Sequence, residues 1–173
     1  MKKGYFWLLG AAVLAAGVGC STPKGNIDYS TVSTLDINRY MGRWYEIARF
    51  DHRFERDLEE CEALYKLLPE GRITVENTGI DAITGKRKIS YGKAHAGRKT
   101  GQLRVSFFWF FYSDYNILAL DENYQWALVG SNSPDYLWIL ARTPQIPKTT
   151  LDVIVAIAQK RGYDTSKLIW VKQ

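Results

Sequence analysis

Gly42-Arg43-Trp44-Tyr45-Glu46-Ile47-Ala48-Arg49-Phe50 is the stretch that decides the fold. Its aromatic and β-branched side chains predict a strand over 44–50. The residues just before it, 36–41, predict a single helical turn, which Asp36 can cap and Gly42 can end. We therefore expect the folded domain to open with a helical turn that leads directly into a strand.

Downstream of this strand, short runs of sheet-forming residues alternate with turn-forming segments. The composition also suits sheets with tight turns, because 14% of the residues are aromatic and 14 are glycine. Eight strands in meander order predict an all-β fold, an eight-stranded antiparallel up-and-down barrel. Beyond the first, we expect strands over 62–68, 72–78, 86–95, 102–108, 115–120, 125–130 and 136–142.

An α-helix is expected after the last of these strands, packed on the outside of the barrel. Thr149 and Asp152 are spaced like a variant capping box, and Gly162 can stop the helix. The run 168–171 predicts one further strand. The apolar stripe that would face the barrel consists of Leu151, Ile154, Val155 and Ala158.

The two ends of the predicted barrel differ in the length of their connections. Each strand of a meander reverses the previous one, so alternate connections lie at the same end. The end that carries Trp44 and Arg142 has short turns and the helical turn 36–41 beside it, and we expect it to be closed. The other end should be an open mouth, formed by the loops 51–61, 79–85, 109–114 and 131–135.

The first part of the chain predicts a targeting signal over residues 1–19. Lys2 and Lys3 precede an uncharged, mostly apolar run, 5–18, which is short for a transmembrane helix. Gly19-Cys20 after this run resembles a bacterial lipobox, which implies that Cys20 is the lipidated first residue of the mature chain. An ordinary secretory signal with an incidental cysteine is the alternative. We expect a tether over 20–34 and the folded domain over 35–173.

The composition argues against several other classes of protein. The formal net charge is +5, but the basic residues are scattered among acids, which is unlike a nucleic-acid-binding surface. The two histidines, His52 and His95, show no metal-ligand spacing, and no nucleotide-binding or nucleophile motif is present. With Cys20 acylated, Cys61 has no disulfide partner. We therefore expect no metal, no cofactor and no enzymatic activity.

Three positions together resemble the lipocalin family. Gly42-x-Trp44 matches the first motif of that family, the turn 121–124 with Asp121 lies where the second falls, and Arg142 matches the lone arginine of the third. The resemblance extends over about 36–171 and implies a barrel that holds a small lipophilic molecule. Arg142 can stack over Trp44 in a cation–π contact worth about 0.5–2 kcal/mol, so we expect these motif residues to be structural.

The lining of the barrel follows from alternation within the strands. The charged residues of each strand should face water, so the residues between them should face inward. In strand 115–120 it is the resemblance that selects the inward residues. An apolar lining with a few polar groups suits an amphipathic ligand, and the alternative is that these side chains fill the core. The candidate ligand-binding residues are Ala63, Tyr65, Val75, Asn77, Val105, Phe107, Asn116, Leu118 and Trp138.

The resemblance to bacterial lipoprotein members of the family also implies a function. It implies a lipocalin that is anchored in the outer membrane by Cys20 and binds, stores or transports fatty acids or lysophospholipids for envelope maintenance. Ser21, the residue after the cysteine, is of the type that favours the outer membrane, and we expect the periplasmic face. Two alternatives are a structural envelope lipoprotein without a ligand and an enzyme that depends on the Cys61 thiol. Whether the protein forms a homodimer stays open.

Residues 107–112 read Phe-Phe-Trp-Phe-Phe-Tyr and fall at the expected mouth. Exposed apolar patches usually mark interactions, so this run predicts a contact with a bilayer or with a ligand chain. A lid folded into the barrel and a dimer contact are the alternatives.

Overall fold

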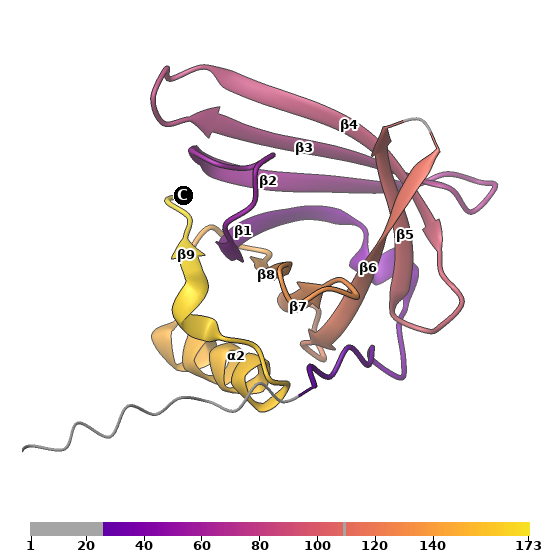
Figure 1. Cartoon of the computed structure of the whole chain (residues 1–173). Coiled ribbons are helices and arrows are strands. Elements are labelled where there is room, and N and C mark those ends of the chain that lie inside the picture. Colours follow the sequence, from indigo (N-terminus) through magenta and orange to yellow (C-terminus); the bar gives the residue numbers. More distant parts are fainter. Residues whose placement is uncertain (1–25, 109) are drawn as a thin grey trace, which may run out of the picture.

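Eight antiparallel strands close into a barrel, which confirms the predicted fold (Figure 1). The computed structural model describes residues 26–108 and 110–173, so the predicted signal peptide 1–19, Cys20 and Trp109 lie outside the described residues. The barrel closes because β1 pairs with β2 near its start and with β8 further along. The strands are β1 (Gly42–Phe50), β2 (Leu58–Leu67), β3 (Ile73–Asp81), β4 (Arg87–Ala96), β5 (Gln102–Phe108), β6 (Phe111–Leu120), β7 (Trp126–Gly130) and β8 (Leu137–Ala141).

Two strands begin four residues earlier than the sequence indicates, both at the mouth end. β2 begins at Leu58 because a bulge between Glu59 and Glu62 lets the strand continue through a charged run that reads as a loop. β6 begins at Phe111, which pairs directly with Phe108 of β5. The expected loop 109–114 is therefore a long hairpin with a short tip.

Helix α2 (Lys148–Lys160) packs on the outside of the barrel, as predicted (Figure 1). Ile154 and Ala158 are its buried residues, and Gly162, with a φ of +92°, follows its end. After a short 3-10 helix, η1 (Thr165–Lys167), the strand β9 (Leu168–Trp170) pairs with β1.

The expected capping of α2 was wrong. Pro147 occupies the N-cap position, and no side chain caps the helix. Asp152 forms an ion pair with Lys148, whose Nζ lies 2.7 Å from its carboxylate. The favourable spacing of four residues between these opposite charges gives Asp152 its partner within the helix.

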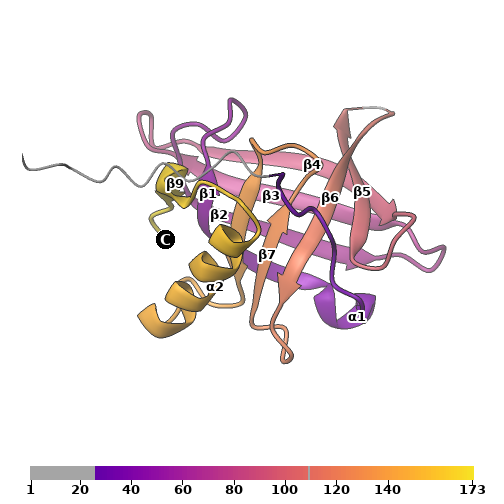
Figure 2. The ribbon, with the colours of Figure 1, turned by 60° about the horizontal axis from the view of Figure 1, so that its bottom comes forward.

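The expected tether was also wrong for the part that the structure describes. Residues 26–34 lie along the barrel, where the Asp28 amide donates to the carbonyl of Arg161 and the Val32 amide donates to that of Ile117, both at 2.9 Å. Figure 2 shows this segment, in indigo, running along the outside of the barrel to α1 (Ile37–Tyr40). The folded domain thus starts before residue 35, because backbone groups of a polar segment find partners on the barrel.

Two apolar clusters divide the core. The interior cluster lies inside the barrel around Trp44 and Tyr65, and the outer cluster lies between the sheet and α2, around Leu128 and Ile139. In the part of the chain that the structure describes, no helix is long and apolar enough to cross a membrane.

Candidate functional site

Arg142 closes one end of the barrel. Its guanidinium carbon lies 3.7 Å from the centroid of the Trp44 ring, which is fully buried. The guanidinium also donates hydrogen bonds to backbone carbonyls of the first helical turn, the start of β1 and the turn between β6 and β7. These acceptors belong to Arg39, Tyr40, Met41, Arg43 and Tyr124. One side chain therefore joins residues 39–43 to the distant turn that contains Tyr124.

The remaining motif residues lie at the same closed end. The Asp121 carboxylate accepts hydrogen bonds from the amides of Asn123 and Gln125, at 2.9 and 3.1 Å, and so fixes the turn. Gly42 has a φ of +94°, and a Cβ there would lie 3.4 Å from Nη1 of Arg142. A side chain at this position would be strained and would crowd the arginine.

Three tyrosines line the floor of the interior, above the closed end. The Tyr40 and Tyr115 hydroxyls are 2.7 Å apart, and the Tyr65 hydroxyl donates to that of Tyr115 at 3.3 Å. Burial raises the pKa of Tyr65 to about 12 and the pKa values of the other two well above their usual range. The floor is thus uncharged at neutral pH, although it carries hydroxyl groups.

Seven of the nine candidate ligand-binding residues face the interior. Asn77 and Phe107 are two of these. Asn77 lies two positions after the inward-facing Val75 on β3, so it faces the same way. Gly92 pairs with Val75 and shares its face of the sheet, and a Cβ added to Gly92 would lie 2.8 Å from the Phe107 ring. The other five belong to the interior cluster or pack against it: Ala63, Tyr65, Val75, Val105 and Trp138.

Asn116 and Leu118 do not line the interior, so the prediction for these two residues was wrong. Leu118 belongs to the outer cluster beneath α2, and Asn116 pairs across the sheet with Gln102, to which it is hydrogen-bonded at 3.2 Å. Ile117 occupies the interior in their place. Asn116 and Leu118 alternate with the inward Tyr115 and Ile117 and so face outward, and the bulge between Ile117 and Ala119 breaks the alternation only beyond Leu118.

A group of charged and polar side chains that the sequence analysis did not select occupies the mouth end of the interior. Arg49 lies at its centre, and its Nη1 is 2.7 Å from the Glu46 carboxylate. Glu55 accepts a hydrogen bond from the Trp138 indole at 3.1 Å, and Nε2 of His52 lies 3.1 Å from the same carboxylate oxygen. Glu46, Arg49 and His52 are all buried. We call Glu46, Arg49, His52 and Glu55 the mouth cluster.

The mouth cluster holds two carboxylates and one arginine in a setting of low solvent access. Burial raises the pKa of the Glu46 carboxyl, and the nearby Glu55 carboxylate raises it further, while Arg49 offsets part of the rise. Among the described residues, Nε of Arg49 and Oδ1 of Asn77 are buried without a hydrogen-bond partner. The mouth end of the interior thus offers one unpaired donor and one unpaired acceptor to a further polar group.

Cys61 lies beside the mouth cluster but is poorly suited to nucleophilic chemistry. Its thiol is buried, and burial raises its pKa to about 12. The thiolate, which is the reactive form, is therefore disfavoured at neutral pH. Within residues 26–108 and 110–173, no group of three or more histidine, cysteine or carboxylate side chains is arranged so that it could hold a metal ion.

The mouth cluster has only a partial signal in the sequence. Glu46 shares the parity of Trp44 in β1, so strict alternation places it inside. Arg49 has the opposite parity and faces inward only because a bulge lies between Glu46 and Ala48. His52 and Glu55 fall in a loop, where alternation gives no direction.

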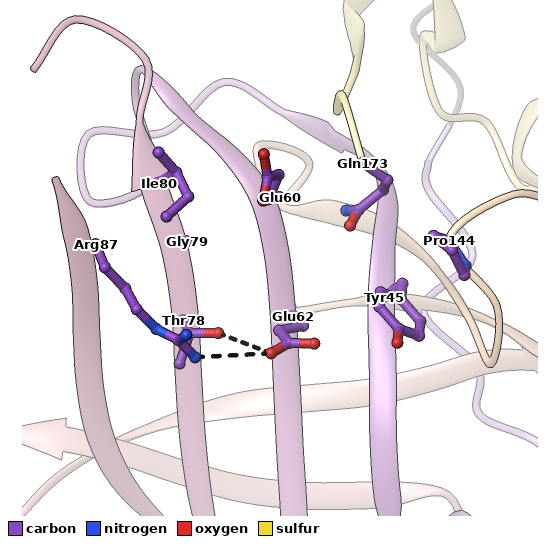
Figure 3. A pocket seen from close by; sticks show the side chains of 9 residues that line it. All are labelled: Tyr45, Glu60, Glu62, Thr78, Gly79, Ile80, Arg87, Pro144 and Gln173. Carbon is purple, nitrogen blue, oxygen red and sulfur yellow. Dashed lines mark hydrogen bonds and ion pairs between the residues drawn. The ribbon is translucent and has the colours of Figure 1, made fainter. Parts of the chain in front are cut away.

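Two hollows open on the outside of the barrel, and the lining of the second includes Arg49 of the mouth cluster. The first, of about 220 Å³, lies over β2 and β3 next to the C-terminus (Figure 3). Its central carboxylate, Glu62, already accepts from Thr78 and forms ion pairs with Arg43 and Arg87. The second, of about 440 Å³, lies between the start of β2 and β9. The charge of Glu62 is satisfied within the chain, so the first hollow is a weaker candidate site than the barrel interior.

Comparison with known proteins agrees with this geometry. A family model described as a lipocalin-like domain matches residues 35–173. The outer membrane lipoprotein Blc of Escherichia coli strain K12 is 47% identical over 158 residues, which cover 90% of this chain and 89% of that protein. Apolipoprotein D of Macaca fascicularis is 36% identical over 144 residues, which cover 78% and 75% of the two chains.

A solved structure supports the fold independently. Insecticyanin from the tobacco hornworm, Manduca sexta, has a TM-score of 0.71 with 20% sequence identity, and the match covers 87% of each chain. At this identity the likeness concerns the fold alone. Together with the family model and the relatives, it confirms the resemblance that the three motifs predicted: this chain is a member of the lipocalin family.

Proposed function

We propose that this lipocalin binds an amphipathic lipid, such as a fatty acid or a lysophospholipid, inside its barrel and performs no reaction on it. The observation that carries the proposal is the division of the interior into an apolar, uncharged floor and the mouth cluster. An acyl chain would lie against the floor, and a polar headgroup would lie among Glu46, Arg49 and Asn77. Because the cluster holds both signs of charge, a zwitterionic headgroup matches it better than a single carboxylate does.

We further propose that the protein is anchored by acylation of Cys20 in the outer membrane, on its periplasmic face, where it stores or transfers lipids for envelope maintenance. The name of the Escherichia coli relative, an outer membrane lipoprotein, supports this location. An acylated cysteine carrying more than one chain would hold the domain stably at a membrane.

Native mass spectrometry of protein extracted from membranes without delipidation tests both statements. We expect the mass of the acylated mature chain, with a second population heavier by one lipid. Acylated protein without any bound lipid would instead support a structural envelope lipoprotein. Protein without acylation would contradict the anchor, and the ligand site would then be tested by the binding measurement below.

A pair of variants on β2 tests the ligand site directly. Ala63→Phe adds a ring inside the barrel, whereas Lys66→Phe adds the same ring on the exposed face of the same strand. We expect the first to weaken binding of a fluorescent fatty acid by about tenfold, which is about 1.4 kcal/mol, and the second to leave it unchanged. Equal binding by two folded variants would contradict an interior site.

A further inference from the structure

The mouth end carries exposed apolar side chains on three of its four loops. Phe54 in the β1–β2 loop is 63% exposed, Ile83 in the β3–β4 loop 78%, and Phe111 beside the β5–β6 tip 71%. Phe108, opposite Phe111 in the hairpin, is 77% exposed. In Figure 2 this hairpin tip stands at the top of the view and α1, at the closed end, lies near the bottom. Apolar side chains exposed together at one end of a protein indicate an interaction surface.

The described chain begins near this same end. Ile27 lies against Gly162, and the ring of the next residue, Tyr163, lies beside two strand ends. Its centroid is 6.2 Å from that of Phe50, the last residue of β1, and its hydroxyl lies beside Gly130, the last residue of β7. Both of these strand ends lie at the mouth. Further along the chain, Val32 and Leu35 pack against the interior cluster near the closed end. The segment therefore enters beside the mouth and runs toward the closed end.

The length of chain before this point limits where an anchor can lie. Cys20 precedes Asn26 by six residues, which can span at most about 20 Å. The ten-residue strand β2 extends over about 33 Å. An anchor on so short a connection, attached beside the mouth, would hold the mouth rather than the closed end close to the membrane.

We infer that the mouth of the barrel docks on the phospholipid bilayer, with Phe54, Ile83, Phe108 and Phe111 inserted among the lipids. The inference rests on the anchor at Cys20 that the proposed function assigns. It gives the lipid a direct path from the bilayer into the interior, without passage through water. The loops 51–57 and 81–88 carry five cations and four carboxylates, so their charges nearly cancel and apolar contact drives the docking.

The test places an environment-sensitive fluorophore at either end of the anchored barrel. The acylated full-length mature protein, in a Cys61→Ser background, is labelled at Ile83→Cys or at Asn123→Cys and added to vesicles of phosphatidylethanolamine and phosphatidylglycerol. We expect blue-shifted emission at position 83, quenched by spin-labelled lipid, and neither effect at position 123. Equal quenching at both positions, or none at 83, overturns the inference.

Flotation of the same samples separates failure of docking from failure of the anchor. Protein that floats with the vesicles without quenching at position 83 contradicts docking and leaves the anchor intact. Acylated protein that does not float contradicts the anchor and the docking that depends on it. A blue shift at 83 that needs no vesicles and grows with protein concentration shows that a second copy covers the mouth, which also overturns the inference.

A matched pair of variants identifies the groups responsible. With the fluorophore at position 83, Phe108→Ser together with Phe111→Ser should remove most of the quenching. Val153→Ser, which removes an exposed apolar group from α2, should leave it unchanged. High salt should also leave it unchanged, and loss of quenching in salt would show electrostatic adsorption instead.

Discussion

Arg142 is the residue on which the closed end depends most. Replacement by Met keeps much of the volume but leaves up to five backbone carbonyls without their donor and removes the cation over Trp44. We expect Arg142→Met to lower the free energy of unfolding in urea by about 2–4 kcal/mol. Arg142→Lys should recover only part of this loss, because an ammonium group cannot reproduce the planar fork of donors.

A surface arginine provides the control for this measurement. Arg72 pairs with Glu70 in the exposed turn between β2 and β3. Arg72→Met should change the stability by less than about 1 kcal/mol. If Arg142→Met and Arg72→Met lowered the free energy of unfolding equally, Arg142 would have no special role in stabilising the closed end.

Glu46 should make the stability of the barrel depend on pH. Its pKa in the folded protein is raised from 4.5 to about 8, so folding favours the protonated form. The free energy of unfolding should therefore fall as the pH rises through this window, because the unfolded chain releases its proton first. Glu46→Gln, which cannot ionise, should flatten the profile measured by urea unfolding across these pH values.

The matched change for this prediction is Glu122→Gln, in the exposed turn between β6 and β7. It should leave the slope of the pH profile as it is in the unmodified protein. A Glu46→Gln profile as steep as that of Glu122→Gln would show that another group titrates.

At the scale of elements, Arg161 holds the N-terminal segment against the barrel. Its guanidinium donates to the carbonyls of Asp28, Ser30 and Leu118, and it forms an ion pair with the Asp28 carboxylate. Arg161→Met should release residues 26–34 while the barrel stays folded. Hydrogen exchange should then accelerate at the amides of Asp28 and Val32.

Lys160, the neighbouring residue at the end of α2, is exposed and makes a suitable comparison. Lys160→Met should leave the exchange of both amides unchanged. Slow exchange in Arg161→Met would mean that the backbone hydrogen bonds hold the segment without the arginine.

Alternation predicted the strands well and the direction of side chains less well. It placed Val75 and Val105 inside correctly, because β3 and β5 are regular there. It could not place Arg49, because this residue follows a bulge and nothing in the local sequence marks the extra residue. In the charged half of the site, Arg49 was missed for this reason, whereas His52 and Glu55 were missed because they lie in a loop. Leu118 was assigned inward from the resemblance rather than from alternation, and it faces outward, opposite to Tyr115 and Ile117.

At the scale of the whole molecule, counting strand reversals was enough to separate the two ends. Trp44, Arg142 and the turn with Asp121 meet at the closed end, as the meander predicts. The docking of residues 26–34 could not be predicted in the same way. Their partners are backbone carbonyls of Arg161 and Ile117. Hydrogen bonds between backbone groups leave no pattern in the sequence of a polar segment.

The pairing of β1 with β8 also sets an order of events during synthesis. The acceptors of Arg142 in residues 39–43 precede it by about a hundred positions, so the contact forms only once nearly the entire chain is available. Contacts of such long range form late and slow the folding of β-proteins. A chain released before residue 137 would lack its closing strand and would remain an open sheet, with the groups meant for the interior exposed to aggregation and proteolysis.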